Sequence, residues 1–337
     1  MEPRLPVGSD TDPPAPSRGA SVVMMVLLLG LAAGVSIAPI GVSIAAVFAF
    51  AGPHNWFEAR YFLSRLPRRL GPFAGFTALG VTGVLVLPSM FILLATATRH
   101  DVRLPGGLPG AVAVWNTLLL VWGAALAVWR QRIPPIRSWP WLIPALPILL
   151  ALAWTRPFLF NLAVVYLHPL LALVFLDREL ARARSVWHPV LRNSLVCLPL
   201  ALIGMFLVCR GASPLQGQDM ISMQIQQHVG AGLLPGLSPR VLVAWHAYLE
   251  LLHYAVWVVA IPKLTVRERP WDLARVPLAR RSDTFRRLIL TTLAVGGLLV
   301  VGLWVGFLMD YGVTRDVYFT VAIFHVIAEV PMLLRVW

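Results

Sequence analysis

Three histidine–glutamate pairs of identical spacing, HNWFE, HAYLE and HVIAE, lie in otherwise apolar stretches of this 337-residue sequence. In each pair the glutamate follows the histidine by four residues; the pairs are His54 and Glu58, His246 and Glu250, and His325 and Glu329. Eight histidines and six glutamates spread over the chain would produce fewer than one such pair by chance. The repetition therefore indicates a shared role for these side chains.

Imidazole and carboxylate groups four residues apart lie on one face of a helix, where both can bind a metal ion. An isolated charge in hydrocarbon costs several kcal/mol, so such groups must pair, lose their charge or bind something. This ligand chemistry favours Fe(II), with Zn or Mn as alternatives. We predict that Glu58, Glu250 and Glu329 are catalytic, as ligands or as bases that orient ligands. The predicted metal ligands are His54, His168, His246, His253 and His325. Local hydrogen bonds within each pair are the structural alternative.

The remaining histidines and the nearby tyrosines have simpler expected roles. His100, His188 and His228 lie in polar contexts and are predicted to be solvated. Tyr166, Tyr248 and Tyr254 are expected to pack in the core or to donate hydrogen bonds to ligands. The sequence has no glycine-rich phosphate loop, no G-x-S-x-G elbow and no C-x-x-C-H haem motif.

The composition of the chain indicates that membrane helices position these histidines and glutamates. Hydrophobic residues make up 58% of the chain and charged residues 13%, and the mean hydropathy is +0.76; soluble domains have about 25% charged residues. Apolar runs of about 20 residues are long enough to cross a bilayer as helices. The sequence predicts an all-α polytopic membrane bundle of about nine transmembrane helices, in one domain over 21–337 after a disordered, Pro-rich tail at 1–20. The predicted crossings are 21–52, 72–98, 109–129, 138–155, 157–176, 193–209, 241–262, 286–309 and 316–335.

The first crossing is the least regular, because 32 residues exceed one perpendicular span and Pro39 lies within them. A hairpin that extends to about Leu63 would make ten crossings. With nine crossings, 20 of the 28 Lys and Arg residues lie in alternate segments, which predicts an external N-terminus and a cytoplasmic C-terminus.

The net charge of +13 comes from arginines at the ends of apolar runs and not from a basic stripe. It therefore indicates membrane topology and attraction to anionic lipids, at the basic segment 263–287 above all, and no nucleic-acid partner. The polar segment around Met220 is expected to form an interfacial helix or a lid. Nothing in the sequence sets the oligomeric state.

Two short motifs resemble those of the Brp/Blh-type membrane carotene dioxygenases. GPHNWFE at 52–58 is similar to their PH-x-x-x-D element, and WHAYLELLHY at 245–254 is similar to a later helix with two histidines on one face. The resemblance implies an intramembrane non-haem iron that cleaves carotene, with His54, His246 and His253 as ligands and His168 as a further one. This chain departs from the family in the spacing of the later histidines, which are seven apart here and four apart there, and in the added His325 and Glu329.

The leading hypothesis is a membrane metalloenzyme, a non-haem iron oxygenase that acts on an apolar, lipid-soluble small molecule such as a carotenoid or another isoprenoid. A proton-coupled transporter or channel that uses the same histidines and glutamates as a relay is the second hypothesis. A structural or haem-binding subunit of a larger membrane complex is the third.

Overall fold

The first apolar segment folds as two helices, α1 (Arg18–Ile37) and α2 (Pro39–Arg65). Ala38 between them has non-helical dihedrals, φ −134° and ψ 61°, and Pro39 takes the first position of α2. Proline suits the first turn of a helix and breaks a helix interior, so it separates the two segments. The single crossing predicted over 21–52 is therefore wrong, and the alternative hairpin is confirmed.

The computed structural model describes residues 18–66, 70–134, 138–212, 215, 219–265 and 276–336; most of the predicted tail, 1–17, lies outside them. Within this part of the chain every regular element is helical. After α1 and α2 come η1 (Gly71–Phe73), α3 (Ala74–Arg99), α4 (Gly107–Gln131), α5 (Leu142–Thr155), α6 (Pro157–Arg182), α7 (Trp187–Leu195), α8 (Cys197–Arg210), α9 (Met220–His228), α10 (Pro239–Ala255), η2 (Val256–Thr265), α11 (Asp283–Met309) and α12 (Tyr311–Val336).

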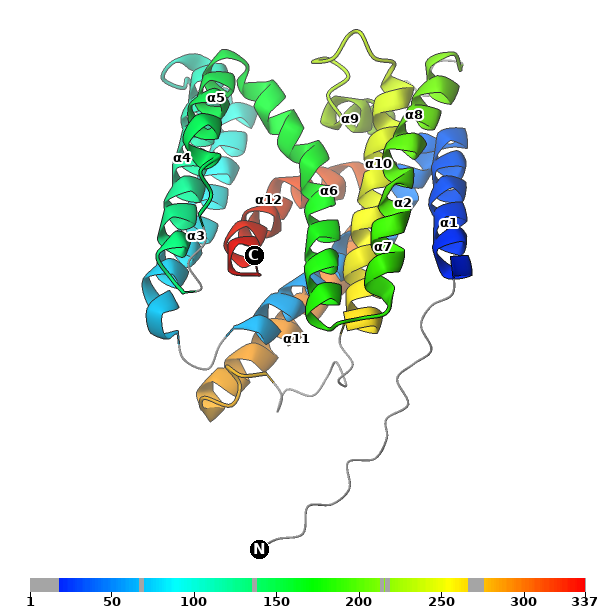
Figure 1. Ribbon diagram of the computed structural model, residues 1–337. Coiled ribbons are helices and arrows are strands. Elements are labelled where there is room, and N and C mark those ends of the chain that lie inside the picture. Colours follow the sequence, from blue (N-terminus) through cyan, green and yellow to red (C-terminus); the bar gives the residue numbers. More distant parts are fainter. Residues whose placement is uncertain are drawn as a thin grey trace, which may run out of the picture.

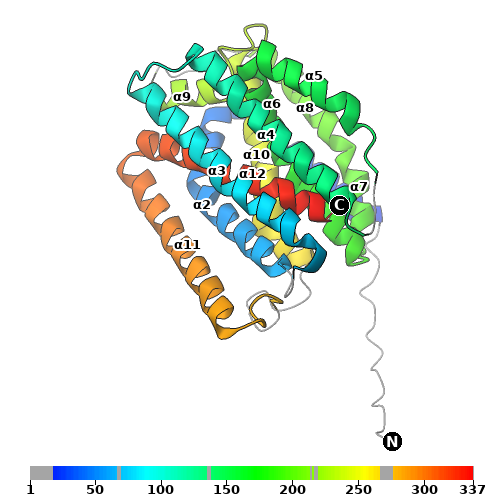
Figure 2. The same ribbon diagram turned by 90° about the vertical axis from the view of Figure 1, so that its left-hand side faces the viewer.

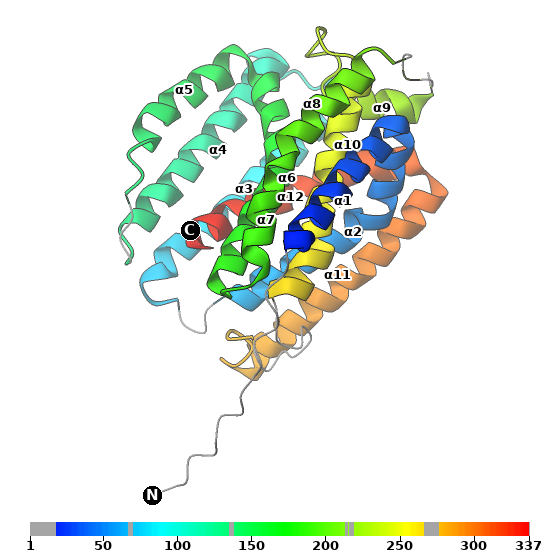
Figure 3. The ribbon, with the colours of Figure 1, turned by 45° about the vertical axis from the view of Figure 1, so that its right-hand side comes forward.

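Nine stretches of the described chain are long and apolar enough to cross a membrane, with α7 and α8 forming one of them and α10 and η2 another. The shorter apolar helix α5 has 14 residues and lies beside α4 and α6 (Figures 1 and 3). The prediction of an all-α polytopic membrane bundle is confirmed. With α1 and α2 separate, the described residues contain nine candidate spans, and α5 is an additional, shorter apolar helix.

Helices α2, α6, α10 and α12 all descend in Figure 1, α6 and α10 steeply and α2 and α12 obliquely. Their final turns, continued by η2 after α10, meet in one buried apolar cluster that includes Tyr61, Leu180, Ile261 and Met332. At the opposite, upper end, the side chain of Arg240 at the start of α10 donates to the backbone carbonyl of Ile37 at the end of α1, at 2.9 Å. Helix α1 thus begins on the lower side, where α12 ends. The prediction of an external N-terminus and a cytoplasmic C-terminus assumed a single crossing over 21–52, where the chain forms two helices.

Close contacts hold α12 against α3 and α4 (Figure 2). A Cβ atom on Gly80 of α3 would lie 3.1 Å from the ring of Pro331, so glycine allows the two helices to approach closely. At the lower end of α4, the Arg130 side chain donates to the backbone carbonyls of Leu334, at 3.1 Å, and Ile133, at 2.8 Å. These contacts fix the depth of α12, and with it the depth of the histidine and glutamate that α12 carries.

Candidate metal centre

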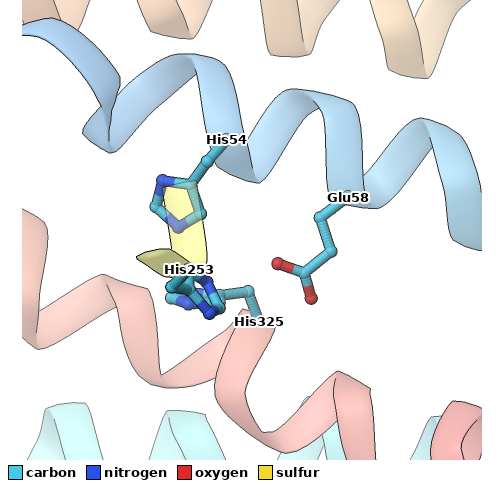
Figure 4. A group of neighbouring side chains, drawn as sticks. All are labelled: His54, Glu58, His253 and His325. Carbon is cyan, nitrogen blue, oxygen red and sulfur yellow. The ribbon is translucent and has the colours of Figure 1, made fainter. Parts of the chain in front are cut away.

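Side chains from the four helices α2, α6, α10 and α12 meet inside the bundle, about one helical turn from the apolar cluster that joins the final turns of these helices. Helix α2 contributes His54 and Glu58, which extend toward His253 of α10 and His325 of α12 (Figure 4). His168 comes from α6 and Glu329 from α12. The structure thus brings together six of the eight predicted site residues, which are separated by as many as 275 positions in the sequence.

The four imidazole rings of this centre are near neighbours. The ring centroid of His253 lies 5.2 Å from that of His54 and 4.6 Å from that of His168. The His325 ring lies 5.2 Å from His54 and 4.9 Å from His168. One nitrogen or carboxylate oxygen from each of His54, Glu58, His253 and His325 fits within a 4.8 Å group, and so does one from each of His168, His253 and Glu329. These separations suit metal ligation.

Hydrogen bonds orient two of the rings. Nδ1 of His54 lies 2.9 Å from the backbone carbonyl of Phe50, which can only accept, so Nδ1 carries the proton and Nε2 keeps its lone pair. Nδ1 of His168 donates in the same way to Oε2 of Glu329, at 2.9 Å. A histidine that is held through one nitrogen by a carbonyl or carboxylate presents the other nitrogen to a metal.

The Nε2 atom of His168 lies 3.1 Å from Nε2 of His325. Two nitrogens bound at about 2.1 Å to the same ion, at a right angle, would be about 3 Å apart. This separation alone would allow both rings to bind one ion, but His168 shares its ligand group with His253 and Glu329 and not with His325. The separation also fits a hydrogen bond in which the His325 nitrogen donates.

Four members of the centre, among them His325 and Glu329, have buried polar atoms without a hydrogen-bond partner, and in two of the four this holds for both polar atoms of the side chain. Both ring nitrogens of His253, which is 2% exposed, and both carboxylate oxygens of Glu58, which is 1% exposed, lack one. An unpaired buried carboxylate costs several kcal/mol in an apolar environment. Metal ligation would satisfy both side chains at once, so these atoms fit a bound divalent ion.

The backbone beside the centre departs from regular α-helix. Pro53 precedes His54 inside α2, and Pro169 follows His168 inside α6. Each proline removes one backbone hydrogen bond and bends the helix at that point. Two residues after His253, α10 continues as the π-helix η2, a form that often occurs at functional sites.

His246 and Glu250 form a separate group nearer the upper side, together with His228 and Tyr254. Oε1 of Glu250 accepts a hydrogen bond from the Tyr254 hydroxyl at 2.7 Å, and Nδ1 of His246 lies 3.7 Å from Oε2. The ring of His246 lies 5.1 Å from that of His228. Neither His246 nor Glu250 belongs to the two ligand groups, so the geometry does not support the metal-ligand role predicted for His246.

His228 is partly buried, against the prediction that it is solvated. It ends α9, which is indeed a helix, and its ring lies 4.2 Å from that of Phe319. Burial, reinforced by the nearby His246 and Arg315, holds the pKa of His228 well below its usual value. The burial of His228 could not be predicted from hydropathy, because α9 lies outside the long apolar runs.

A cavity of about 400 Å³ connects the two groups. His54, His168, His253 and His325 line its inner end, and His228, His246 and Glu250 line its upper part. Apolar side chains, among them Phe91, Trp115, Val164 and Ile323, form much of the remaining wall. At the rim, Arg99 and Asp316 are 46% and 55% exposed and form an ion pair at 2.5 Å, so the cavity reaches the surface there.

A buried apolar layer closes the cavity below the centre. It includes Phe175 of α6 and Trp257 of η2, whose ring centroids are 5.4 Å apart, together with Tyr61 of α2 and Met332 of α12. Below this layer the buried carboxylate of Glu179 accepts a hydrogen bond from Tyr61 at 2.8 Å and pairs with Arg65. The cavity in the described part of the chain thus ends at the histidines.

The other residues singled out in the sequence lie outside the centre. His100 is exposed, as predicted. His188 is not simply solvated, because its Nε2 bonds the carboxylate of Asp177 at 2.9 Å. Tyr166 donates to the carbonyls of Val229 or Leu242, both at 3.1 Å, and Tyr248 is fully buried in the core beside α8. Only Tyr254, which bonds Glu250 and lies 4.5 Å from the His54 ring, is placed to orient residues of the site.

Comparison of the chain with protein-family models, with characterised proteins and with solved structures gives no match. The similarity of the two short motifs to carotene dioxygenases therefore stays a prediction. The function has to be argued from the geometry of the centre and its cavity.

Proposed function

We propose that the protein is a membrane metalloenzyme, a non-haem iron oxygenase that acts on an apolar, lipid-soluble molecule. The observation that carries this proposal is the convergence of four imidazoles and two carboxylates at the closed inner end of a largely apolar cavity. Imidazole and carboxylate together favour Fe(II) among the common metals, with Zn or Mn as alternatives.

The chain's residues divide into ligands and supports. His54, His168, His253, His325, Glu58 and Glu329 would hold the metal, which when bound supplies the ability to activate O2. The Phe50 carbonyl and the Glu329 carboxylate orient His54 and His168. In the upper part of the cavity, Tyr254 holds Glu250 through its hydroxyl, so that this carboxylate faces the space a substrate would fill.

The substrate class follows from the cavity wall. Aromatic and aliphatic side chains such as Phe91, Trp115 and Ile323 offer few hydrogen bonds, so they suit a hydrocarbon and exclude water from the centre. We propose a carotenoid or other isoprenoid, in line with the motif similarity. The rim beside Arg99 and Asp316 would admit it at the level where α3 ends and α12 begins.

A proton-coupled transporter or channel is the main competing function. Transport requires access from both sides of the membrane, whereas the cavity ends at a layer that includes Phe175 and Trp257. This layer favours an enzyme that is open on one side. The third hypothesis, a haem-binding subunit, would also use histidines, but no feature of the cavity favours a porphyrin over a linear hydrocarbon.

We propose that the lower side faces the cytoplasm. With α5 counted as a tenth pass, 22 of the 28 Lys and Arg residues belong to segments at that side or to the ends of the helices beside them. The positive-inside rule then places both termini in the cytoplasm and the rim of the cavity on the opposite side. A reporter fused to either end would report a cytoplasmic location, and an external one for both would reverse the orientation.

Expression in carotene-producing cells tests the activity. We expect loss of carotene and formation of a cleaved product that is detected by chromatography, and retention of all carotene with the His253→Ala variant. His100→Ala is the matched control, because His100 is exposed and outside the cavity. Purified protein that contains no Fe, Zn or Mn would end the proposal of a metalloenzyme. Ion flux in proteoliposomes without any lipid turnover would favour the transporter.

A further inference from the structure

The ligands of the centre form two overlapping sets and not one. His54, Glu58, His253 and His325 make the first set, and His168, His253 and Glu329 make the second. Ligand atoms around a single ion, at about 2.1 Å from it, would all lie within about 4.2 Å of one another. The six side chains do not meet even a 4.8 Å limit as one group, and they meet it as two. The geometry therefore points to two metal positions.

His253 is the residue common to both sets. Its ring lies between those of His54, at 5.2 Å, and His168, at 4.6 Å. Both of its nitrogens are buried and without a hydrogen-bond partner, whereas His54 and His168 each use Nδ1 in a hydrogen bond. His253 is thus the ring with neither nitrogen in a hydrogen bond, and once its single N–H proton is released it can bind an ion on each side.

Charge is divided between the two sets in the same way. Each contains one carboxylate, Glu58 in the first and Glu329 in the second, and each carboxylate follows a histidine of its own helix by four residues. A divalent ion in an apolar interior needs an anionic ligand to offset its charge. One carboxylate for each position provides this without concentrating both charges on one ion.

We propose that the centre binds two divalent metal ions, one held by His54, Glu58 and His325 and the other by His168 and Glu329, with His253 between them. This inference rests on the proposed function only in that the histidines and glutamates bind metal. It goes further in assigning two ions to the centre. In two-metal sites generally, both ions stabilise charge that develops during the reaction.

The number of ions per chain is the test. Full-length protein in detergent is loaded anaerobically with Fe(II), freed of unbound metal, and analysed for iron per polypeptide by mass spectrometry. We expect two ions in the wild type and in the exposed control His100→Ala. Glu58→Gln and Glu329→Gln, which keep side-chain size and remove one carboxylate each, should each retain one ion, a twofold loss.

The outcomes separate the two proposals. One ion in the wild type overturns the pair and leaves the metalloenzyme intact, and no ion with Fe(II), Zn(II) or Mn(II) overturns both. Because the wild-type count decides by itself, the test does not depend on whether a variant folds. Electron paramagnetic resonance of the oxidised protein gives a second reading, since two coupled ferric ions suppress the signal that an isolated ferric ion shows. An intense isolated-ion signal that accounts for all the iron would also overturn the pair.

Discussion

Helices α10 and α11 are consecutive along the chain, and their environments are opposite. In the most apolar 18-residue segment of α10 and η2, 78% of the residues are buried inside the protein. In the corresponding segment of α11, 6% are buried. Yet α11 is the more hydrophobic of the two. It packs along α2, where the indole nitrogens of Trp56 and Trp304 bond the backbone carbonyls of Leu293 and Phe48 across the contact, and it leaves side chains such as Leu298, which is 72% exposed, to face lipid.

The difference shows how burial works in a membrane protein. Lipid is as apolar as leucine, so an apolar helix gains little by leaving it, whereas a helix with polar side chains must be enclosed. His246, Glu250 and His253 follow one face of α10, and this face lies at the centre of the bundle. The polar groups, and not the apolar ones, therefore mark the interior of the protein.

The largest expected effect comes from removing a polar group of α10. His253→Ala deletes the shared member of both ligand sets, and we expect metal content and activity to fall by about 100-fold or more, above the range typical of residues that only support ligands. Iron content and carotene turnover measure this. Equal losses in His100→Ala would show that the effect is not specific to the centre.

The opposite substitution on α11 tests the other half of the comparison. Leu298→Lys places a charge at the middle of a lipid-facing helix, which costs about 2.5–3.5 kcal/mol in membrane insertion. We expect a much smaller yield of inserted protein in membrane fractions, while Leu298→Ala, at the same position, changes it little. A normal yield of Leu298→Lys would mean that α11 is covered by protein and not by lipid.

A smaller effect is expected from a single hydroxyl of α10. Tyr254→Phe removes the hydrogen bond to Glu250, worth about 0.5–1.5 kcal/mol, and leaves the ring beside His54 in place. Activity should fall by several-fold and the iron content should not change. Loss of iron in this variant would instead make Glu250 part of the metal site.

The smallest effect concerns pH and the residue that ends α9. The pKa of His228 is well below its usual value in the folded protein because the ring is buried, so only the unfolded chain takes up a proton as the pH falls below about 6.5. Stability should therefore decrease by about 1 kcal/mol between pH 6.5 and 5.5 through this group. His228→Asn should lower this pH dependence of thermal unfolding. An unchanged dependence would show that the ring is neutralised in some other way.

The sequence predicted the helical membrane fold and most residues of the centre. It did not predict that His246 and Glu250 lie in a separate group. The repeated histidine–glutamate spacing identified α2, α10 and α12 as helices that bring titratable side chains into the interior of the bundle. His246 and His253 share a helix face, but seven residues of helix separate them by about 10.5 Å, too far for one ion, and helical rise alone could have shown this. The contact between His168 and Glu329 depends on how α6 and α12 pack, which no local pattern encodes.

Two other features depended on tertiary structure. Pro39 signalled the break between α1 and α2, but only the structure shows that α1 packs against α8 while α2 packs against α10 and α11, and that each helix is long enough to span a membrane. Glu179 lies in a polar-looking sequence, DREL, and is nevertheless buried, because Tyr61 and Arg65 of α2 reach it from 114 or more residues away in the chain. The sequence places neither helix relative to the other.

The last histidine and glutamate of the centre are on the final helix of the chain. A ribosome must therefore finish α12 before any metal site exists, while Glu58 has been in the membrane since the second helix emerged. A chain that stops before Tyr311 would contain thirteen of the fourteen helical elements of the described residues and still lack both side chains that α12 brings to the proposed metal centre, His325 and Glu329.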